Sequence, residues 1–314
     1  MGRGNFMQLQ NELFSIFQNG DDEKIVTLIE KIKSLYPERK EKYLFWEACF
    51  FATRGQISRA VSALMNGINQ GIWWNPNTLK GDPDLKNIQS DLSFLEIIRI
   101  CEERLLNEKH KRGQCKLFTY GSSESDIALF ILHWRGSNVT DFSSFWLDEY
   151  TIANYYFGFP QSSQIHSYNN YCWDDPSRTK QDIELCLQQF QPLSKSFILA
   201  GASQGGKVAF EYFLKNQDNR FDGLILVIPS IQKVSEYEEM VRKAKTRSNK
   251  IFIITGDQDY FYKDTMELVS LLKDYHFDCQ IHVIKGLGHY FPNDFTRILE
   301  QAVDTIRGNN LNFQ

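Results

Sequence analysis

The chain has 314 residues, of which 42% are hydrophobic and 14% aromatic, enough for a sizeable core in one large domain or two ordinary ones. Its formal net charge of −4 gives no overall basic field, which argues against nucleic acid or acidic lipid as a partner. No apolar run approaches the roughly 20 residues of a membrane span, and the N-terminus lacks the apolar stretch of a signal peptide. The six cysteines are scattered without a C-x-x-C pair, so we expect buried free thiols in a cytoplasmic protein.

Apolar residues follow helical spacing up to about residue 108. The segment DDEKIVTLIEKIKSLYP (21–37) begins with acidic residues and ends at a proline, which are start and stop signals of a helix. Its apolar residues share one helical face: Ile25, Leu28, Ile29, Ile32 and Leu35. The segment 42–72 predicts two further helices with a break at Arg54-Gly55. We therefore expect an all-α first domain.

These helices carry a faint internal repeat of about 35 residues. The matching positions are Gly20, Ile25 and Ile29 in the first copy and Gly55, Ala60 and Leu64 in the second. The pattern resembles the tetratricopeptide helix-turn-helix repeat, whose period is about 34 residues, and a non-repetitive helical cap is the alternative. We predict that this domain covers residues 1–110 and leads into the charged linker NEKHKRGQ (107–114). It is a candidate surface for a protein partner or a dimer.

From residue 111 onward, short apolar runs alternate with amphipathic segments. The predicted strands are 116–120, 127–134, 196–201, 223–229, 250–256 and 280–286. The predicted helices between them include 178–190, 206–216 and 262–277. This alternation predicts a second domain over residues 111–314, with a mostly parallel sheet covered by helices on both faces. Ligand sites in such sheets form at the carboxyl ends of the strands.

The segment GASQGGK (201–207) fits two unrelated chemistries. A phosphate-binding G-x-x-x-x-G-K loop needs a serine or threonine next, but Val208 stands there and cannot coordinate Mg²⁺. A G-x-S-x-G nucleophile turn needs a buried strand before the serine and a helix after it, and both are predicted here. The neighbouring glycines permit the strained backbone of such a turn. The sequence therefore predicts Ser203 as a nucleophile and argues against a nucleotide-binding loop.

A base and an acid follow this serine at the ends of later predicted strands. A serine hydroxyl is a weak nucleophile until an imidazole takes its proton, and a carboxylate fixes the orientation of that imidazole. His289, in the glycine-flanked stretch GLGH, is the candidate base. For the acid we favour Asp259, because the extra residues after Gly256 let its carboxylate turn toward the imidazole. The alternative acid, Asp257, would instead cap the loop by accepting hydrogen bonds from backbone N–H groups.

Taken together, these motifs resemble the bacterial phospholipase/carboxylesterase group of α/β-hydrolases. GASQGG is close to that group's G-F-S-Q-G-G, and FPQSSQ (159–164) with YCWDD (171–175) resembles its P-Q-S-S-Q … W-D-D pattern. TGDQD and GLGH complete the set, and the order Ser, Asp, His is that of the α/β-hydrolase arrangement. The resemblance covers about residues 115–308. It implies an α/β-hydrolase fold and hydrolysis of carboxylic esters or thioesters through an acyl-enzyme on Ser203.

One stretch departs from the pattern of the group, which has a His-Gly-x-Gly turn whose backbone N–H helps to bind the oxyanion. This chain has His133-Trp134-Arg135-Gly136, with tryptophan where glycine is expected. By resemblance, the oxyanion donors would be the backbone N–H groups of Arg135 and Gln204. A tryptophan does not readily take positive φ, so we expect a reshaped loop. Trp134 would either line the acyl pocket or pack against the helical half.

Two further aromatic residues are candidates for substrate contact. Trp173 either contacts the substrate or anchors its loop before the next helix, and Tyr290, beside the proposed base, either lines the site or covers it. With no H-E-x-x-H motif and no cysteine ligand cluster, we expect neither a metal nor an organic cofactor. The sequence thus predicts a serine hydrolase for a small-molecule ester or thioester. The alternative is a helical-repeat binding or scaffold protein whose hydrolase fold has little or no activity.

Overall fold

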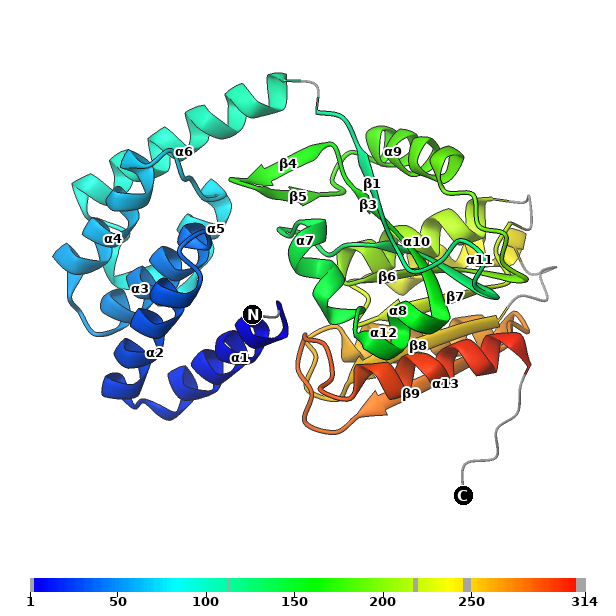
Figure 1. The fold of residues 1–314 in the computed structure, drawn as a ribbon. Coiled ribbons are helices and arrows are strands. Elements are labelled where there is room, and N and C mark those ends of the chain that lie inside the picture. The colour runs from blue at the N-terminus through cyan, green and yellow to red at the C-terminus, as the bar shows by residue number, and fades with distance from the viewer. Residues whose placement is uncertain (1–2, 112, 217–219, 245–249, 309–314) are drawn as a thin grey trace. The chain divides into compact units, whose positions relative to one another are not determined.

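The computed structural model describes residues 3–111, 113–216, 220–244 and 250–308 (Figure 1). Contacts divide the chain into two compact units. One comprises Met1–Arg112 together with Ile165–Asn169, and the other comprises Gly113–Gln164 and Asn170–Gln314. The predicted division into domains 1–110 and 111–314 stays a prediction, and these contacts add a distant segment to the helical unit.

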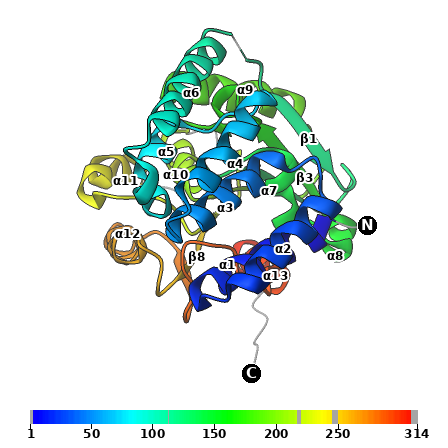
Figure 2. The same cartoon turned by 90° about the vertical axis from the view of Figure 1, so that its left-hand side faces the viewer.

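The first unit is built from helices joined by short turns (Figure 2). They are α1 (Arg3–Asn19), α2 (Asp22–Leu35), α3 (Lys40–Thr53), α4 (Ile57–Asn69), α5 (Pro76–Gly81), the 3₁₀ helix η1 (Pro83–Ile88) and α6 (Leu92–His110). The break predicted at Arg54-Gly55 separates α3 from α4, and the expectation that the chain is helical up to His110 is confirmed, although the unit also includes residues of the strand β4 (Gln164–Ser167). No helix among the described residues is long and apolar enough to cross a membrane.

Two helical hairpins, α1–α2 and α3–α4, have the same layout. A glycine with positive φ separates the helices of each hairpin, Gly20 at 75° and Gly55 at 68°. The repeat positions in the second helix of each hairpin are buried: Ile25, Ile29, Ala60 and Leu64. Leu35, however, is 40% exposed at the end of α2, so the buried face of this helix ends earlier than predicted. Membership of the tetratricopeptide family stays a prediction.

The second unit contains a seven-stranded sheet in the order β1-β3-β2-β6-β7-β8-β9. Its strands are β1 (Lys116–Tyr120), β2 (Ile127–Leu132), β3 (Tyr155–Gln161), β6 (Ser196–Ala202), β7 (Gly223–Val227), β8 (Lys250–Gly256) and β9 (Cys279–Ile284). Only β1, at the edge, pairs antiparallel with its neighbour, and the other pairs are parallel. The chain also forms a two-stranded sheet from β4 (Gln164–Ser167) and β5 (Asn170–Cys172).

Helices cover both faces of the large sheet (Figure 1). They are α7 (Val139–Phe142), η2 (Ser143–Phe145), α8 (Glu149–Asn154), α9 (Pro176–Gln189), α10 (Gln204–Lys215), η3 (Val234–Tyr237), α11 (Glu238–Ala244), α12 (Tyr262–Asp274) and α13 (Phe295–Arg307). Because side chains alternate along a strand, Phe130 of β2 packs into one core with α9, α10 and α12, whereas Leu129 packs into the other with α7 and α13. The predicted mostly parallel sheet with helices on both faces is confirmed.

One strand of the large sheet, β3, is absent from the sequence-based prediction. It contains Pro160, and a proline argues against an interior strand because it cannot donate to the hydrogen-bond ladder. In the structure, the pairing of β3 with β2 ends at Gly158, so Pro160 lies beyond it and pairs in register with Leu117 of β1 alone. The proline is therefore tolerated at a position where β3 has lost one neighbour.

Candidate active site

Ser203 occupies the turn between strand β6 and helix α10. Its φ of 50° and ψ of −117° lie outside the regions that residues with a side chain normally occupy. The turn is held by the backbone: Ser203 N–H donates to Val227 O at 3.0 Å, and Ser203 O accepts from Ser230 N–H at 3.1 Å. Strain of this kind persists only where the surrounding structure enforces it, and it occurs at functional sites.

Two glycines of the G-x-S-x-G motif allow the close packing that this turn requires. A Cβ atom at Gly201 would collide with the carbonyl oxygen of Gly205, and one at Gly205 would collide with the carbonyl oxygens of Leu132 and His133. The start of α10 therefore lies directly against the end of β2. This contact brings the residue after Ser203 close to the loop that follows β2.

The structure brings the three proposed catalytic side chains together from the ends of β6, β8 and β9. His289 Nε2 lies 2.8 Å from Ser203 Oγ, and His289 Nδ1 lies 2.9 Å from the nearer carboxylate oxygen of Asp259. The Asp259 side chain has no exposed surface, whereas that of His289 is 14% exposed. One Asp259 oxygen also accepts the N–H of Phe261 at 2.9 Å, which fixes the carboxylate. This is the arrangement of a nucleophile, a base and an orienting acid.

Asp257, the alternative acid, has a different role in the structure. Its Oδ1 accepts the backbone N–H of Gly286 at 2.7 Å, which ties the end of β8 to the loop after β9. Gly286 has a φ of 76°, so this tight loop depends on a residue that tolerates the left-handed region. The bond supports the loop that carries His289.

The loop after β2, which carries the expected oxyanion donor, is fixed by a buried histidine. His133 has no exposed surface, and burial lowers its pKa to about 4, which keeps the ring neutral near pH 7. Its Nδ1 lies 2.8 Å from Trp134 O, and its Nε2 lies 3.3 Å from the backbone N–H of Ser162. An imidazole with its proton on Nδ1 fits both contacts. Trp173 Nε1 then donates to His133 O at 2.8 Å.

Trp134 fits into this loop without the positive φ that glycine would permit, since Gly136 is the loop residue with positive φ, at 72°. The Gly136 N–H donates to Tyr171 O at 2.8 Å. Within the part of the chain that the structure describes, neither the N–H of Arg135 nor that of Gln204 donates to a protein acceptor. Both groups are available to a ligand, and the packing of Gly205 against the end of β2 brings their two segments together.

Trp134 packs among aromatic side chains of the α/β unit. Its ring centroid lies 4.9 Å from that of Phe145, 5.5 Å from Phe291, 5.7 Å from Phe142 and 5.9 Å from Tyr290. Trp134, Phe145 and Tyr290 are only partly buried. These side chains, Trp134, Phe142, Phe145, Tyr290 and Phe291, form what we call the aromatic cluster below. It includes Tyr290, the residue that follows His289 in the chain.

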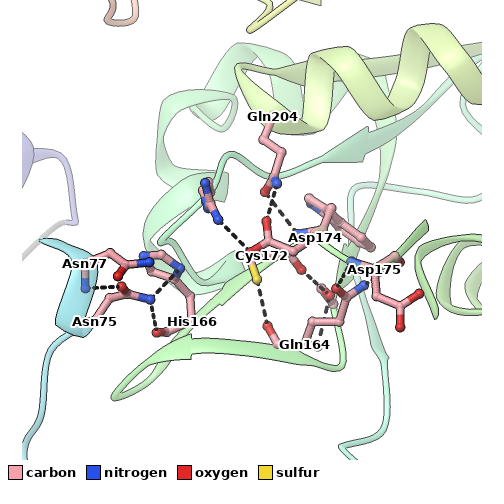
Figure 3. A network of polar contacts seen from close by, with 11 residues as sticks. Asn75, Asn77, Gln164, His166, Cys172, Asp174, Asp175 and Gln204 are labelled. Atoms are coloured by element: carbon pink, nitrogen blue, oxygen red, sulfur yellow. Dashed lines mark hydrogen bonds and ion pairs between the residues drawn. The ribbon is translucent and has the colours of Figure 1, made fainter. Parts of the chain in front are cut away.

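Trp173 has the geometry of an anchor, since the residue is only 4% exposed and its indole N–H donates to the loop after β2. Its backbone N–H donates to Gln204 Oε1 at 3.0 Å. The neighbouring Asp174 accepts from the side chains of Gln204 and Arg135 (Figure 3). A cavity of about 450 Å³ borders this network, with walls from Trp173, Asp174, Gln204, α9 and α10.

The sequence did not reveal that the PQSSQ and WDD segments hold each other. Gln164 Oε1 accepts the Asp175 N–H at 2.7 Å (Figure 3), and Ser162 Oγ donates to Cys172 O at 2.6 Å. Asp175 in turn caps α9 by accepting the N–H of Ser177 at 2.9 Å. The sequence shows both motifs and their spacing, but not which residues of one bond to which residues of the other.

Comparison with known proteins gives a family match for the helical part of the chain. A model described as "A/B hydrolase-like, N-terminal domain" matches residues 5–109. The structure is similar to the crystal structure of an uncharacterized protein from Bacillus cereus ATCC 10987, with 26% sequence identity and a TM-score of 0.53. That match covers 97% of this chain and 99% of the other. No curated protein matches the sequence.

Two more distant structures match only part of the chain. One is a phospholipase/carboxylesterase from Dyadobacter fermentans DSM 18053, with 18% identity, a TM-score of 0.44, and coverage of 61% of this chain and 97% of that one. The other is acyl-protein thioesterase 2 from Zea mays, with 15% identity, a TM-score of 0.49, and coverage of 62% and 99%.

Proposed function

We propose that this chain, in which an α/β-hydrolase fold follows a segment matched by the A/B hydrolase-like N-terminal domain, is a serine hydrolase. It would cleave carboxylic esters or thioesters. The observation that carries this proposal is the chain of contacts from Ser203 through His289 to Asp259, with heavy-atom distances of 2.8 and 2.9 Å. It starts at a serine on a strained strand-to-helix turn.

In the proposed cycle, Ser203 Oγ attacks the acyl carbonyl carbon while its proton passes to His289 Nε2. Asp259 accepts the Nδ1–H of the imidazole and stabilises the imidazolium that forms. The carbonyl oxygen becomes an oxyanion between the N–H groups of Arg135 and Gln204. As the tetrahedral intermediate collapses, the bond to the leaving alcohol or thiol breaks, and His289 returns the proton to that group.

The second half of the cycle releases the acid. His289 takes a proton from water, the resulting hydroxide attacks the acyl-enzyme, and the ester bond to Ser203 breaks with return of the proton to Oγ. No step requires a metal or an organic cofactor. The partly buried rings of Trp134, Phe145 and Tyr290 support a small-molecule substrate with an apolar or aromatic portion next to the reacting carbonyl.

The rival proposal is a binding or scaffold protein whose hydrolase fold has little or no activity, and an oxyanion loop disrupted by Trp134 would favour it. That residue now fits the loop without positive φ and leaves the N–H of Arg135 available, so it gives the rival no support. The strain at Ser203 favours the enzyme, because an inactive fold has no need of it. A protein partner or a dimer through the helical domain, and a cytoplasmic location, stay predictions.

The proposal is tested with a panel of p-nitrophenyl esters and acyl thioesters of increasing chain length. We expect Ser203→Ala to lower kcat/KM on every accepted substrate by on the order of 10⁴-fold or more. The matched control is Ser230→Ala, because Ser230 contacts the turn through its backbone N–H, which the substitution keeps. Hydrolysis that persists in Ser203→Ala, or a wild-type chain that cleaves none of the panel, would overturn the proposal.

A further inference from the structure

A single carboxylate lies between the two segments that carry the proposed oxyanion donors. Arg135 donates to one oxygen of Asp174 at 2.6 Å, and the Gln204 side chain donates to the other at 2.7 Å (Figure 3). The backbone N–H groups of these same two residues, Arg135 and Gln204, are the proposed donors. We propose that Asp174 is a positioning residue that sets the distance between the two oxyanion donors. This inference rests on the proposed serine hydrolase function.

The Gln204 side chain is held at both ends of its amide. Its Nε2 donates to Asp174, and its Oε1 accepts the backbone N–H of Trp173 at 3.0 Å. Gln204 is the first residue of α10, so its side chain and its N–H are attached to the same short piece of backbone. Fixing the side chain therefore restricts the direction of the N–H that would face the oxyanion.

The segment that carries Asp174 is itself tied to the loop after β2. Trp173 Nε1 donates to His133 O at 2.8 Å, two residues before Arg135. On its other side, Asp175 caps α9 and donates its backbone N–H to Gln164 Oε1 at 2.7 Å. Asp174 thus stands on a rigid base, from which its carboxylate reaches both donor segments.

The charges favour this arrangement. Burial by itself would raise the pKa of Asp174, but the hydrogen bond from Gln204 and the neighbouring Arg135 outweigh it and hold the pKa below its ordinary value. The carboxylate is therefore ionised at neutral pH and accepts from both partners.

The contribution of this ion pair to stability is small, which separates a positioning role from a structural one. The side chains of Arg135 and Asp174 are 54% and 44% exposed, and exposed ion pairs contribute little to stability. In contrast, loss of one oxyanion donor typically costs about 10²- to 10³-fold in kcat. A displaced donor should lower kcat less than a missing donor does. It should still lower kcat much more than a slight loss of stability would.

The test compares Asp174→Asn with Asp175→Asn, a matched change at the next residue that keeps the acceptor oxygen capping α9. We expect Asp174→Asn and Arg135→Gln each to lower kcat roughly 10- to 100-fold with little change in KM, because the donors act on the transition state. The double variant should have about the same kcat as the single variants, since each single substitution already breaks the same bridge. Affinity for a trifluoromethyl ketone should fall in proportion to kcat/KM, with thermal midpoints unchanged.

The proposal is overturned if Asp174→Asn matches Asp175→Asn in kcat, or if its loss of kcat follows a loss of thermal stability. A second readout does not depend on catalysis. Amide hydrogen exchange in residues 133–137 and in the first turn of α10 should be faster in Asp174→Asn than in Asp175→Asn. A wild-type chain without hydrolase activity would reject the proposed function, and the exchange rates would still decide whether Asp174 holds the two segments.

Discussion

His133 has no exposed surface, and it fixes the loop after β2 through both ring nitrogens. Burial lowers its pKa from 6.5 to about 4 in the folded protein, whereas in the unfolded chain it keeps the ordinary value. Above pH 6.5 the ring is neutral in both states and has no effect on the pH dependence of stability. Between pH 6.5 and 4 the unfolded chain binds the proton first, so acidification favours unfolding.

We therefore expect the free energy of unfolding to fall by roughly 3 kcal/mol more between pH 7 and pH 4 in the wild type than in His133→Gln. The glutamine variant is less stable at pH 7 but has no imidazole to protonate at this position. Urea unfolding at a series of pH values measures both slopes. Equal slopes for the two proteins would show that His133 is not held neutral by burial.

At the residue level, the sequence predicted the residue types of the site better than their partners. The order of Ser203, Asp259 and His289 along the chain was visible because each follows a predicted strand. The sequence favours Asp259 over Asp257, but the partners of the two carboxylates, Gly286 N–H for Asp257 and His289 for Asp259, depend on the path of the loop. The bridge from Asp174 to Gln204 joins residues 30 apart, and no local pattern indicates it.

The elements around the site differ in how clearly the sequence predicts them. The buried strand β2 is a continuous apolar run and the helix α10 has amphipathic helical spacing, and the predicted elements at these positions are confirmed. The strand β3 was not predicted, because Pro160 argues against a strand at this position. The proline is tolerated because the pairing of β3 with β2 stops before it. The pairing of a strand with its neighbours is a long-range property, which a local reading of propensity does not contain.

The aromatic cluster joins four segments: the loop after β2, the helix α7, the 3₁₀ helix η2, and the loop after β9. Since Trp134 supplies its largest ring, we expect Trp134→Ala to widen the site beside His289. The ratio of kcat/KM for long-chain over short-chain esters should rise roughly 10-fold, the scale of one or two methylene contacts. Steady-state kinetics on the ester panel measures this ratio.

The matched control is Trp46→Ala, another partly buried tryptophan, which stacks on Phe6 in the helical unit. It should lower stability without changing the order of substrate preference. If Trp134→Ala also leaves the preference unchanged, the aromatic cluster is packing alone, and the apolar portion of the substrate binds elsewhere.

At the scale of the whole molecule, the helical unit is not one continuous piece of chain. Residues Ile165–Asn169 belong to it, and Ile165 packs against its hydrophobic core. Asn75 Nδ2 donates to His166 O at 3.0 Å (Figure 3), and Tyr168 N–H donates to Trp73 O at 3.1 Å. The sequence predicted the change from helical to mixed strand and helix patterns near residue 110. It gave no sign of a contact between residues 91 apart.

The substitution Asn75→Asp tests the contact between the segment Ile165–Asn169 and the rest of the helical unit. Asn75 also caps α5 by accepting the Asn77 N–H at 2.9 Å, and an aspartate keeps that acceptor while losing the donor to His166. We expect a loss of roughly 1–3 kcal/mol in the free energy of unfolding, because the His166 carbonyl then faces a carboxylate. The exposed Asn77→Asp is the control and should stay within about 0.5 kcal/mol. Equal stability of the two variants would contradict the importance of this contact.

The central claim, that Ser203 is an activated nucleophile, is tested most directly by intact-mass measurement after treatment with a fluorophosphonate. The account predicts one covalent adduct on the wild-type chain, located at Ser203 by peptide mapping, and no adduct on Ser203→Ala. His289→Ala should label far more slowly, because the serine then has no base to take its proton. An unlabelled wild-type chain, or an adduct that persists in Ser203→Ala, would contradict the account.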